Sequence, residues 1–191
     1  MIAADRFIAR YSDFDQWIAA RAGGVSATEV RDASTPSGFL QVVERRRNPV
    51  RVIPNAYMDF GSEHEGWIAL WLKREYGLMP NEWLIAAEDN PLYFSTPDAL
   101  SLDHSEIGEV KTWGTEPKSV PLAHRRQAQW QLRSSGAVRC FYAGMLRREV
   151  NGVLVPAWVE PKVWVIERDD ELIAELEATA ERILESDHEH V

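Results

Sequence analysis

The sequence contains one cysteine, Cys140, among its 191 residues. A single thiol excludes an internal disulfide framework, a cysteine zinc site and an iron–sulfur cluster, and it fits a reducing compartment. No apolar run approaches the length of a membrane span, and the N-terminus lacks the apolar region of a signal peptide. We therefore expect a cytoplasmic protein with no membrane partner, in which Cys140 is a small, inert core residue.

Basic residues are outnumbered, with 21 lysines and arginines against 30 acids and a formal charge of −9. That balance argues at first against a nucleic-acid partner. However, residues 167–191 hold ten acids against two arginines, which leaves 20 acids against 19 bases in the rest of the chain. Local arginine clusters decide whether a polyanion can dock, although ordinary solvated surface is the competing interpretation of each. The clusters are Arg45-Arg46-Arg47 with Arg51, Arg125-Arg126 with Arg133, and Arg147-Arg148.

The chain shows no internal repeat, low-complexity tract or linker, so we expect a single domain over residues 1–191. Apolar periodicity predicts helices at 13–22, from Ser26 onward, at 57–76, at 124–134, and an acidic one at 169–186 before a frayed tail, 187–191. Alternation predicts strands at 83–87, 92–95, 98–102, 107–113, 138–146, 153–159 and 162–167. Residues 36–54 are expected to be a loop with a short helical piece around 41–46. This order predicts an α/β (α+β) fold with helices flanking a central mixed sheet.

Two carboxylates and an amine stand in neighbouring strand segments. Asp98 follows Pro97, and Glu109 and Lys111 flank Val110. Because strand side chains alternate, Glu109 and Lys111 point to the same face. Carboxylates are ligands for hard divalent cations, and a lysine beside such a cation can hold or deprotonate a water. The alternative is an exposed strand face that carries a cross-strand ion pair.

A further acid belongs to the predicted 57–76 helix. Glu65 shares its stripe with Ile68 and Leu72, so we expect it to face inward. A carboxylate on an apolar stripe is costly unless it is paired with an arginine or bound to a metal, and both remain open.

The start of the second helix carries a capping-box pattern, Ser26-Ala27-Thr28-Glu29. Free backbone N–H groups at a helix start, with Arg21 just upstream, favour a phosphate seat. A plain capped helix is the competing interpretation.

Taken in order, these motifs resemble the PD-(D/E)XK nuclease superfamily and, within it, the lambda-type phage exonuclease and YqaJ-like viral recombinase family. The segment 17–30 is similar to the family's N-terminal motif, and Gly61-Ser62-Glu63-His64-Glu65 to its G-x-x-x-E helix. Ser95-Thr96-Pro97-Asp98 with Glu109-Val110-Lys111 resembles its S-P-D-G and E-x-K, and Gln127-Ala128-Gln129 its Q-x-Q helix. The chain departs from the family pattern at Thr96, Ala99, Thr112 and His124, the last of which replaces a common tyrosine.

The resemblance implies a restriction-endonuclease-like core and Mg²⁺-dependent digestion of one strand of duplex DNA from 5′ ends, in phage-type recombination and single-strand annealing. It implies two Mg²⁺ ions, with Mn²⁺ as a substitute. The implied ligands are Asp98, Glu109, Glu65 and the carbonyl oxygen of Val110.

The family also implies roles for the remaining residues. Lys111 would orient or activate the attacking water, and Gln127 would hold Lys111 or the scissile phosphate. The terminal 5′-phosphate would be held by Arg21, Ser26 and Thr28. The implied partners are DNA ends, further copies of the chain in a ring-shaped homotrimer, and a single-strand annealing protein.

Two rival functions remain. One is a structure-specific endonuclease or nickase on the same core, and the other is a non-catalytic DNA-end-binding protein. Trp113 and Trp130 are candidates for stacking on bases, but we favour core packing for both. His188-Glu189-His190 could chelate a metal, although a solvated tail is the favoured interpretation.

Overall fold

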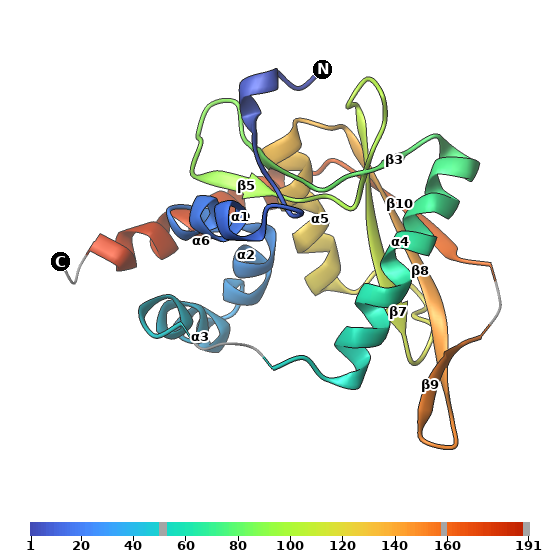
Figure 1. The fold of residues 1–191 in the computed structure, drawn as a ribbon. Helices are drawn as coiled ribbons and strands as arrows, with labels where there is room; N and C mark the ends of the chain where they lie inside the picture. The colour runs from blue at the N-terminus through green and yellow to red at the C-terminus, as the bar shows by residue number, and fades with distance from the viewer. Residues whose placement is uncertain (50–52, 158–159, 189–191) are drawn as a thin grey trace.

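The computed structural model describes residues 1–49, 53–157 and 160–188 (Figure 1). Arg51 of the first arginine cluster, the end of the predicted 153–159 strand, and Glu189, His190 and Val191 of the tail lie outside the described residues. The elements in chain order are η1 (Ala4–Arg6), β1 (Phe7–Arg10), α1 (Phe14–Ala22), β2 (Val25–Ser26), α2 (Ala27–Ala33), α3 (Pro36–Arg47), α4 (Ala56–Tyr76), β3 (Met79–Pro80), β4 (Trp83–Ala86), β5 (Tyr93–Ser95), β6 (Ala99–Leu100), β7 (Glu106–Trp113), α5 (Leu122–Ser135), β8 (Arg139–Val150), β9 (Val153–Pro156), β10 (Lys162–Glu167) and α6 (Asp170–His188).

The larger sheet has the strand order β10-β8-β7-β6-β3, with β9 paired to the far end of β8. β7 runs parallel to β8 along its whole length, and the other pairings in this sheet are antiparallel. β6 pairs with β7 only through Ala99 and Leu100, opposite Gly108 and Ile107. The half of β7 that follows Gly108 therefore has a backbone edge that β6 does not cover. The predicted mixed α+β fold with helices against a central sheet is confirmed.

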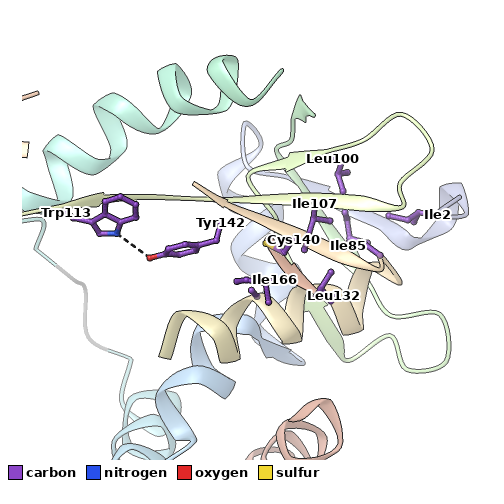
Figure 2. Packing of buried hydrophobic residues seen from close by; sticks show 11 residues of the cluster. Ile2, Ile85, Leu100, Ile107, Trp113, Leu132, Cys140, Tyr142 and Ile166 are labelled. Atoms are coloured by element: carbon purple, nitrogen blue, oxygen red, sulfur yellow. Dashed lines mark hydrogen bonds between the residues drawn. The ribbon is translucent and has the colours of Figure 1, made fainter. Parts of the chain in front are cut away.

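Opposite faces of β7 and β8 are covered by different helices, α4 on one side and α5 on the other (Figure 2). Strand alternation separates the two sets of core residues. Phe60, Ile68, Leu72, Val110, Phe141 and Ala143 pack together under α4. Ile107, Trp113, Leu132, Cys140, Tyr142 and Ile166 pack on the α5 side, where Figure 2 shows most of them between the strands and the helix. The side chains of Glu109 and Lys111 point to the same face of β7 as Ile107 and Trp113, which is the face that α5 covers.

A second, smaller sheet has the order β1-β4-β5-β2 and lies beside a group of helices. Its antiparallel β4–β5 pair corresponds to the strands predicted at 83–87 and 92–95. Helices α2, α3 and α6 gather on the side of the molecule away from α4 (Figure 1). They share a core that includes Val30, Val42, Leu176, Ala180 and Ile183. Arg21 of α1 and Ala27 at the start of α2 line the same pocket as Asp98, beside Ser95 at the carboxyl end of β5.

The helical piece predicted around 41–46 is confirmed, but the loop predicted on either side of it is wrong over residues 36–47, which all belong to the helix α3. Thr35 caps this helix by accepting a hydrogen bond from the backbone N–H of Gly38, and Pro36 occupies its first turn, where its missing N–H costs nothing. Val42 and Val43 are buried, so tertiary packing stabilises a segment whose arginines made it look like loop. No helix among the described residues is long and apolar enough to cross a bilayer.

The preference for core packing of the tryptophans and the cysteine is confirmed. Trp113 is 8% exposed, and Trp130 and Cys140 are fully buried. The Trp130 indole N–H donates to the carbonyl of Phe94 at 3.2 Å, which satisfies its only polar atom inside the core.

Candidate nuclease site

Glu109 and Lys111 lie side by side on the α5 face of β7, as strand alternation predicts. The Lys111 ammonium donates to Glu109 Oε1. The Glu109 side chain is 2% exposed and that of Lys111 is 25% exposed, so only the lysine reaches water. The cross-strand ion pair on an exposed face is therefore wrong, because this pair lies within one strand and its acid is buried.

Two glutamines one turn apart on α5 bind the buried carboxylate. Gln127 Nε2 donates to Glu109 Oε1 at 2.6 Å, and Gln131 Nε2 donates to Oε2 at 2.6 Å. Hydrogen bonds to a charged acceptor are stronger than neutral ones, and here they replace the water that burial removes. Gln129 points elsewhere, to the carbonyl of Glu167 and the N–H of Asp169.

Asp98 immediately precedes β6, at the point where the pairing of β6 with β7 stops. Its backbone N–H donates to the carbonyl of Gly108 at 2.9 Å, and its Oδ2 accepts from the backbone N–H of Val110 at 2.6 Å. The carboxylate thus takes up a backbone donor on the uncovered edge of β7. Asp98 and Glu109 are brought together from two strands by this register.

Glu65 reaches the same place from α4, but it is exposed, whereas Ile68 and Leu72 are fully buried. The predicted inward stripe is therefore wrong at Glu65. The sheet covers the helix face at Ile68 and Leu72, while the same face borders a pocket at Glu65.

The charges at the site shift one another's pKa values. Burial, and then the negative charge of Glu109, raise the pKa of Asp98 well above its usual range. Although Glu65 as a residue is exposed, partial desolvation of its carboxyl group at the pocket wall raises its pKa. Burial lowers the pKa of the Lys111 ammonium, but the carboxylates of Glu109 and Asp98 outweigh it and the net shift is upward. Three carboxyl groups thus surround one ammonium, and an additional cation would relieve their repulsion.

The donor set suits a hard divalent cation, since it consists of carboxylate oxygens and the exposed carbonyl edge of β7. Within the described parts of the chain, however, no three acidic, histidine or cysteine side chains are grouped closely enough to form a ready metal cage. Instead, the Lys111 ammonium donates a hydrogen bond to one oxygen of Glu109.

A pocket of about 340 Å³ connects this cluster to the first helices. Its walls include Asp98, Glu65, Gln127 and Gln131 on one side and Arg21, Trp17, Ser26 and Thr28 on the other. The predicted phosphate-seat residues therefore border the same cavity as the predicted catalytic residues.

Arg21 is the member of the predicted phosphate seat that carries a positive charge. Its guanidinium lies over the Trp17 ring, 4.2 Å from the centroid. Burial lowers its pKa, with a smaller opposing effect of Glu29. Among the described residues, no salt bridge engages Arg21, which lines the pocket, and Glu29 acts on it only from a distance.

The two hydroxyl residues of the seat differ from each other. The predicted capping box is confirmed, and Ser26 Oγ donates to Glu29 Oε2 at 2.7 Å, so its proton is already used. Thr28 is exposed at the pocket wall. Helix α2 has only seven residues, which limits the field that its N-terminus can supply.

Sequence reasoning missed two residues of the cluster. Gln131 shares a helix face with Gln127, a spacing visible in the sequence, but its contact with Glu109 was not predicted. Arg31 was missed entirely. It donates from Nη1 to Gln127 Oε1 at 3.0 Å across 96 residues of sequence, a contact that no local pattern signals.

Comparison with known proteins agrees with the fold. No protein-family model matches the chain, and no curated protein sequence matches it. Among solved structures, the chain is similar to an alkaline exonuclease from Laribacter hongkongensis, with 26% identity, a TM-score of 0.71, and coverage of 92% of this chain and 93% of that one. The same exonuclease in complex with dAMP gives the same values.

A phage-related exonuclease from Haemophilus somnus shares the fold, with 13% identity, a TM-score of 0.67, and coverage of 85% of this chain and 92% of that one. These neighbours confirm the resemblance to the lambda-type exonuclease and YqaJ-like family that the motifs indicate.

Proposed function

We propose that this chain, which has the fold of the alkaline and phage-type exonucleases, is a DNA exonuclease. One observation carries the proposal: Asp98, Glu109, Lys111 and Gln127 converge at the edge of β7, beside a pocket that also holds Arg21. The similarity to the Laribacter exonuclease over 92% of the chain supports the same activity.

We further propose that catalysis depends on Mg²⁺, with Mn²⁺ as a substitute. Asp98, Glu109, Glu65 and the carbonyl of Val110 would hold two ions, which would stabilise negative charge on the phosphate and lower the pKa of a bound water. Binding would require the Lys111 ammonium to leave Glu109 Oε1. The upward pKa shift of Asp98 supports the idea: burial is its largest cause, and the negative charge of Glu109 adds to it, so a divalent ion would stabilise the ionised pair.

The chain's own residues would then perform defined tasks. Lys111, whose pKa is raised, would be protonated at neutral pH and would orient the attacking water or the scissile phosphate through its ammonium protons. Gln127 holds Glu109 in place. Arg21, with Thr28 and Ser26 at the same wall, would bind the terminal 5′-phosphate and so set the polarity as 5′ to 3′.

The pocket size supports stepwise release of mononucleotides. Its volume of about 340 Å³ is within the range of small-ligand pockets and suits one terminal nucleotide rather than a stretch of strand. The Laribacter exonuclease forms a complex with dAMP, a product of this kind.

One experiment tests these points together. The chain is incubated with linear duplexes that carry a 5′-phosphate or a 5′-hydroxyl, and with closed circles, in Mg²⁺ or EDTA. We expect loss of the strand labelled at its 5′ end, faster with phosphate, abolished by EDTA, and no attack on circles. Degradation of closed circles would favour an endonuclease or nickase, and DNA binding without any cleavage would favour an end-binding protein.

The remaining family expectations are a homotrimeric ring, a single-strand annealing protein as partner, and a role in recombination. The acidic outer face of α6 would suit the outside of a ring whose bore is basic. Light scattering tests the trimer directly, because it would give three times the chain mass of 21.8 kDa.

A further inference from the structure

The three glutamines of α5 are not equivalent, although all of them are buried. They are Gln127, Gln129 and Gln131. An amide side chain has two donor hydrogens and one acceptor oxygen, and burial makes every unpaired group costly. The way in which each amide is paired therefore distinguishes a structural glutamine from one retained for another reason.

Gln129 is paired at both ends with backbone groups. Its Nε2 donates to the carbonyl of Glu167 at 2.7 Å, and its Oε1 accepts from the N–H of Asp169 at 2.9 Å. These bonds join α5 to the junction between β10 and α6. Gln129 is thus a structural residue that stabilises the fold and has no contact with Glu109.

Gln127 is also paired at both ends, but with side chains of the site. Its Nε2 donates to Glu109 Oε1, and its Oε1 accepts from Arg31 Nη1 at 3.0 Å. Asp32 in turn accepts from Arg31 Nε at 2.8 Å and from Arg45 at 2.9 Å. A guanidinium cannot accept a hydrogen bond, so this contact fixes the Gln127 amide with its nitrogen toward Glu109.

Gln131 is paired at one end only. Its Nε2 donates to Glu109 Oε2 at 2.6 Å, while its Oε1 is buried and, among the described residues, has no hydrogen-bond donor. Gln131 is 2% exposed. The side chain of Gln131 therefore pairs with Glu109 and with no other described residue, unlike those of Gln127 and Gln129.

The bonds to Glu109 show what Gln131 does. Oε1 receives two donors, Lys111 and Gln127, whereas Oε2 receives only Gln131. A carboxylate oxygen has two lone pairs, so Gln131 takes one on Oε2 and leaves the other without a donor among the described residues. Gln131 thereby fixes the direction in which the free lone pair of Oε2 points.

We propose that Gln131 is a positioning residue for the nuclease site, which orients the Glu109 carboxylate so that Oε2 is presented to a divalent cation. The proposal rests on the proposed function. Because Gln131 acts through Glu109, its loss should lower the rate of the bound complex and the response to metal, and should leave DNA affinity unchanged.

Gln131→Met tests the proposal, with Gln129→Met on the same helix as the matched control. For Gln131→Met we expect kcat on a 5′-phosphorylated duplex to fall about 10- to 100-fold, the loss expected for one hydrogen bond to a charged group, with KM unchanged. Mn²⁺ should raise the Tm of this variant less than it raises the wild-type Tm. For Gln129→Met we expect a lower Tm, with wild-type kcat and a wild-type response to Mn²⁺.

The outcomes separate the two levels of inference. If the wild type is active and Gln131→Met keeps the full kcat, the positioning role of Gln131 is wrong and the proposed function still holds. The same holds if Mn²⁺ raises the Tm of Gln131→Met as much as it raises the wild-type Tm, because Gln131 then does not orient Glu109 toward the cation. A wild type with neither nuclease activity nor a Tm response to Mn²⁺ overturns the proposed function, and the positioning role with it.

Discussion

Asp98 Oδ2 accepts a hydrogen bond from the backbone N–H of Val110 at 2.6 Å, just beyond the point where β6 stops pairing with β7. The Asp98 side chain thus adds one more hydrogen bond to the edge of β7, beyond the last backbone pair that β6 makes with it. Its position depends on the register of Ala99 opposite Gly108, and a slip of one residue would turn the neighbouring side chains to the other face. The acid of the P-D motif is consequently placed by the sheet itself.

Asp98→Asn should raise Tm at neutral pH and abolish nuclease activity. Burial and Glu109 raise the folded-state pKa of Asp98, so its proton is bound more tightly in the folded chain than in the unfolded one. The resulting stability is complete below the unfolded pKa and is lost as pH rises through the folded pKa. Asparagine stays neutral, so its advantage over the wild type should grow from pH 4 to pH 7. Calorimetry should show a gain of a few degrees, at about 2–4 °C per kcal/mol.

Asp103→Asn is the control, because it should change Tm in the opposite direction. Hydrogen bonds from the Ser101 hydroxyl and from Ser105 lower the pKa of Asp103, so its ionised form stabilises the folded chain above the unfolded pKa. The variant should therefore lose Tm at pH 7 and keep full activity. If both aspartate variants changed Tm in the same direction, the electrostatic explanation would be wrong.

Lys111→Ala should lower kcat by at least about 100-fold, a loss comparable to that of a preorganised donor at a developing charge. The ammonium is the one cation that contacts Glu109 among the described residues. Lys162→Ala is the control, since Lys162 pairs with Glu116 on the exposed surface. Single-turnover digestion of a labelled duplex measures both, and an active Lys111→Ala would exclude the proposed mechanism.

Arg21→Ala should remove the preference for a 5′-phosphate over a 5′-hydroxyl. A hydrogen bond between a guanidinium and a phosphate contributes about 1.5–3 kcal/mol, which corresponds to roughly 10- to 100-fold in KM for the phosphorylated end. Arg10→Ala is the matched control, because Arg10 lies over Trp83 and outside the pocket. Retention of the phosphate preference in Arg21→Ala would place the phosphate seat elsewhere.

Gly144→Ala should destabilise the chain. A Cβ at Gly144 would lie 2.2 Å from a ring carbon of Trp113, so the buried indole would have to move, at a cost of about 1–3 kcal/mol. Gly66→Ala is the control, since a Cβ there meets nothing within 4 Å and alanine favours the α4 helix by roughly 0.5–1 kcal/mol. Thermal unfolding should therefore give Tm changes of opposite sign.

Much of the site was predictable because it depends on local periodicity. Strand alternation alone placed Glu109 and Lys111 on one face, and helical spacing placed Gln127 beside Gln131 and turned Gln129 away. The capping box at Ser26 was also readable, because its bonds span only three residues. Interactions between near neighbours in the chain leave a pattern in the sequence.

The errors arose where distant segments compete for the same surface. Glu65 has the phase of a buried residue, but its turn of α4 borders a pocket at that point instead of the packed core. Residues 36–47 look like a polar loop until α2 and α6 supply a surface on which Val42 can be buried. Neither partner surface is visible from the segment itself.

The sequence by itself determined which chemical groups are present, in what order, and on which face of its own strand or helix each one lies. Tertiary structure decided that Arg31 holds Gln127, that Gln131 holds Glu109, and that Arg21 shares a pocket with Asp98. The physical reason is that local conformation follows from sterics and hydrogen bonding between near neighbours. The pairing of buried charges, in contrast, depends on where the whole core brings segments that are distant in the chain.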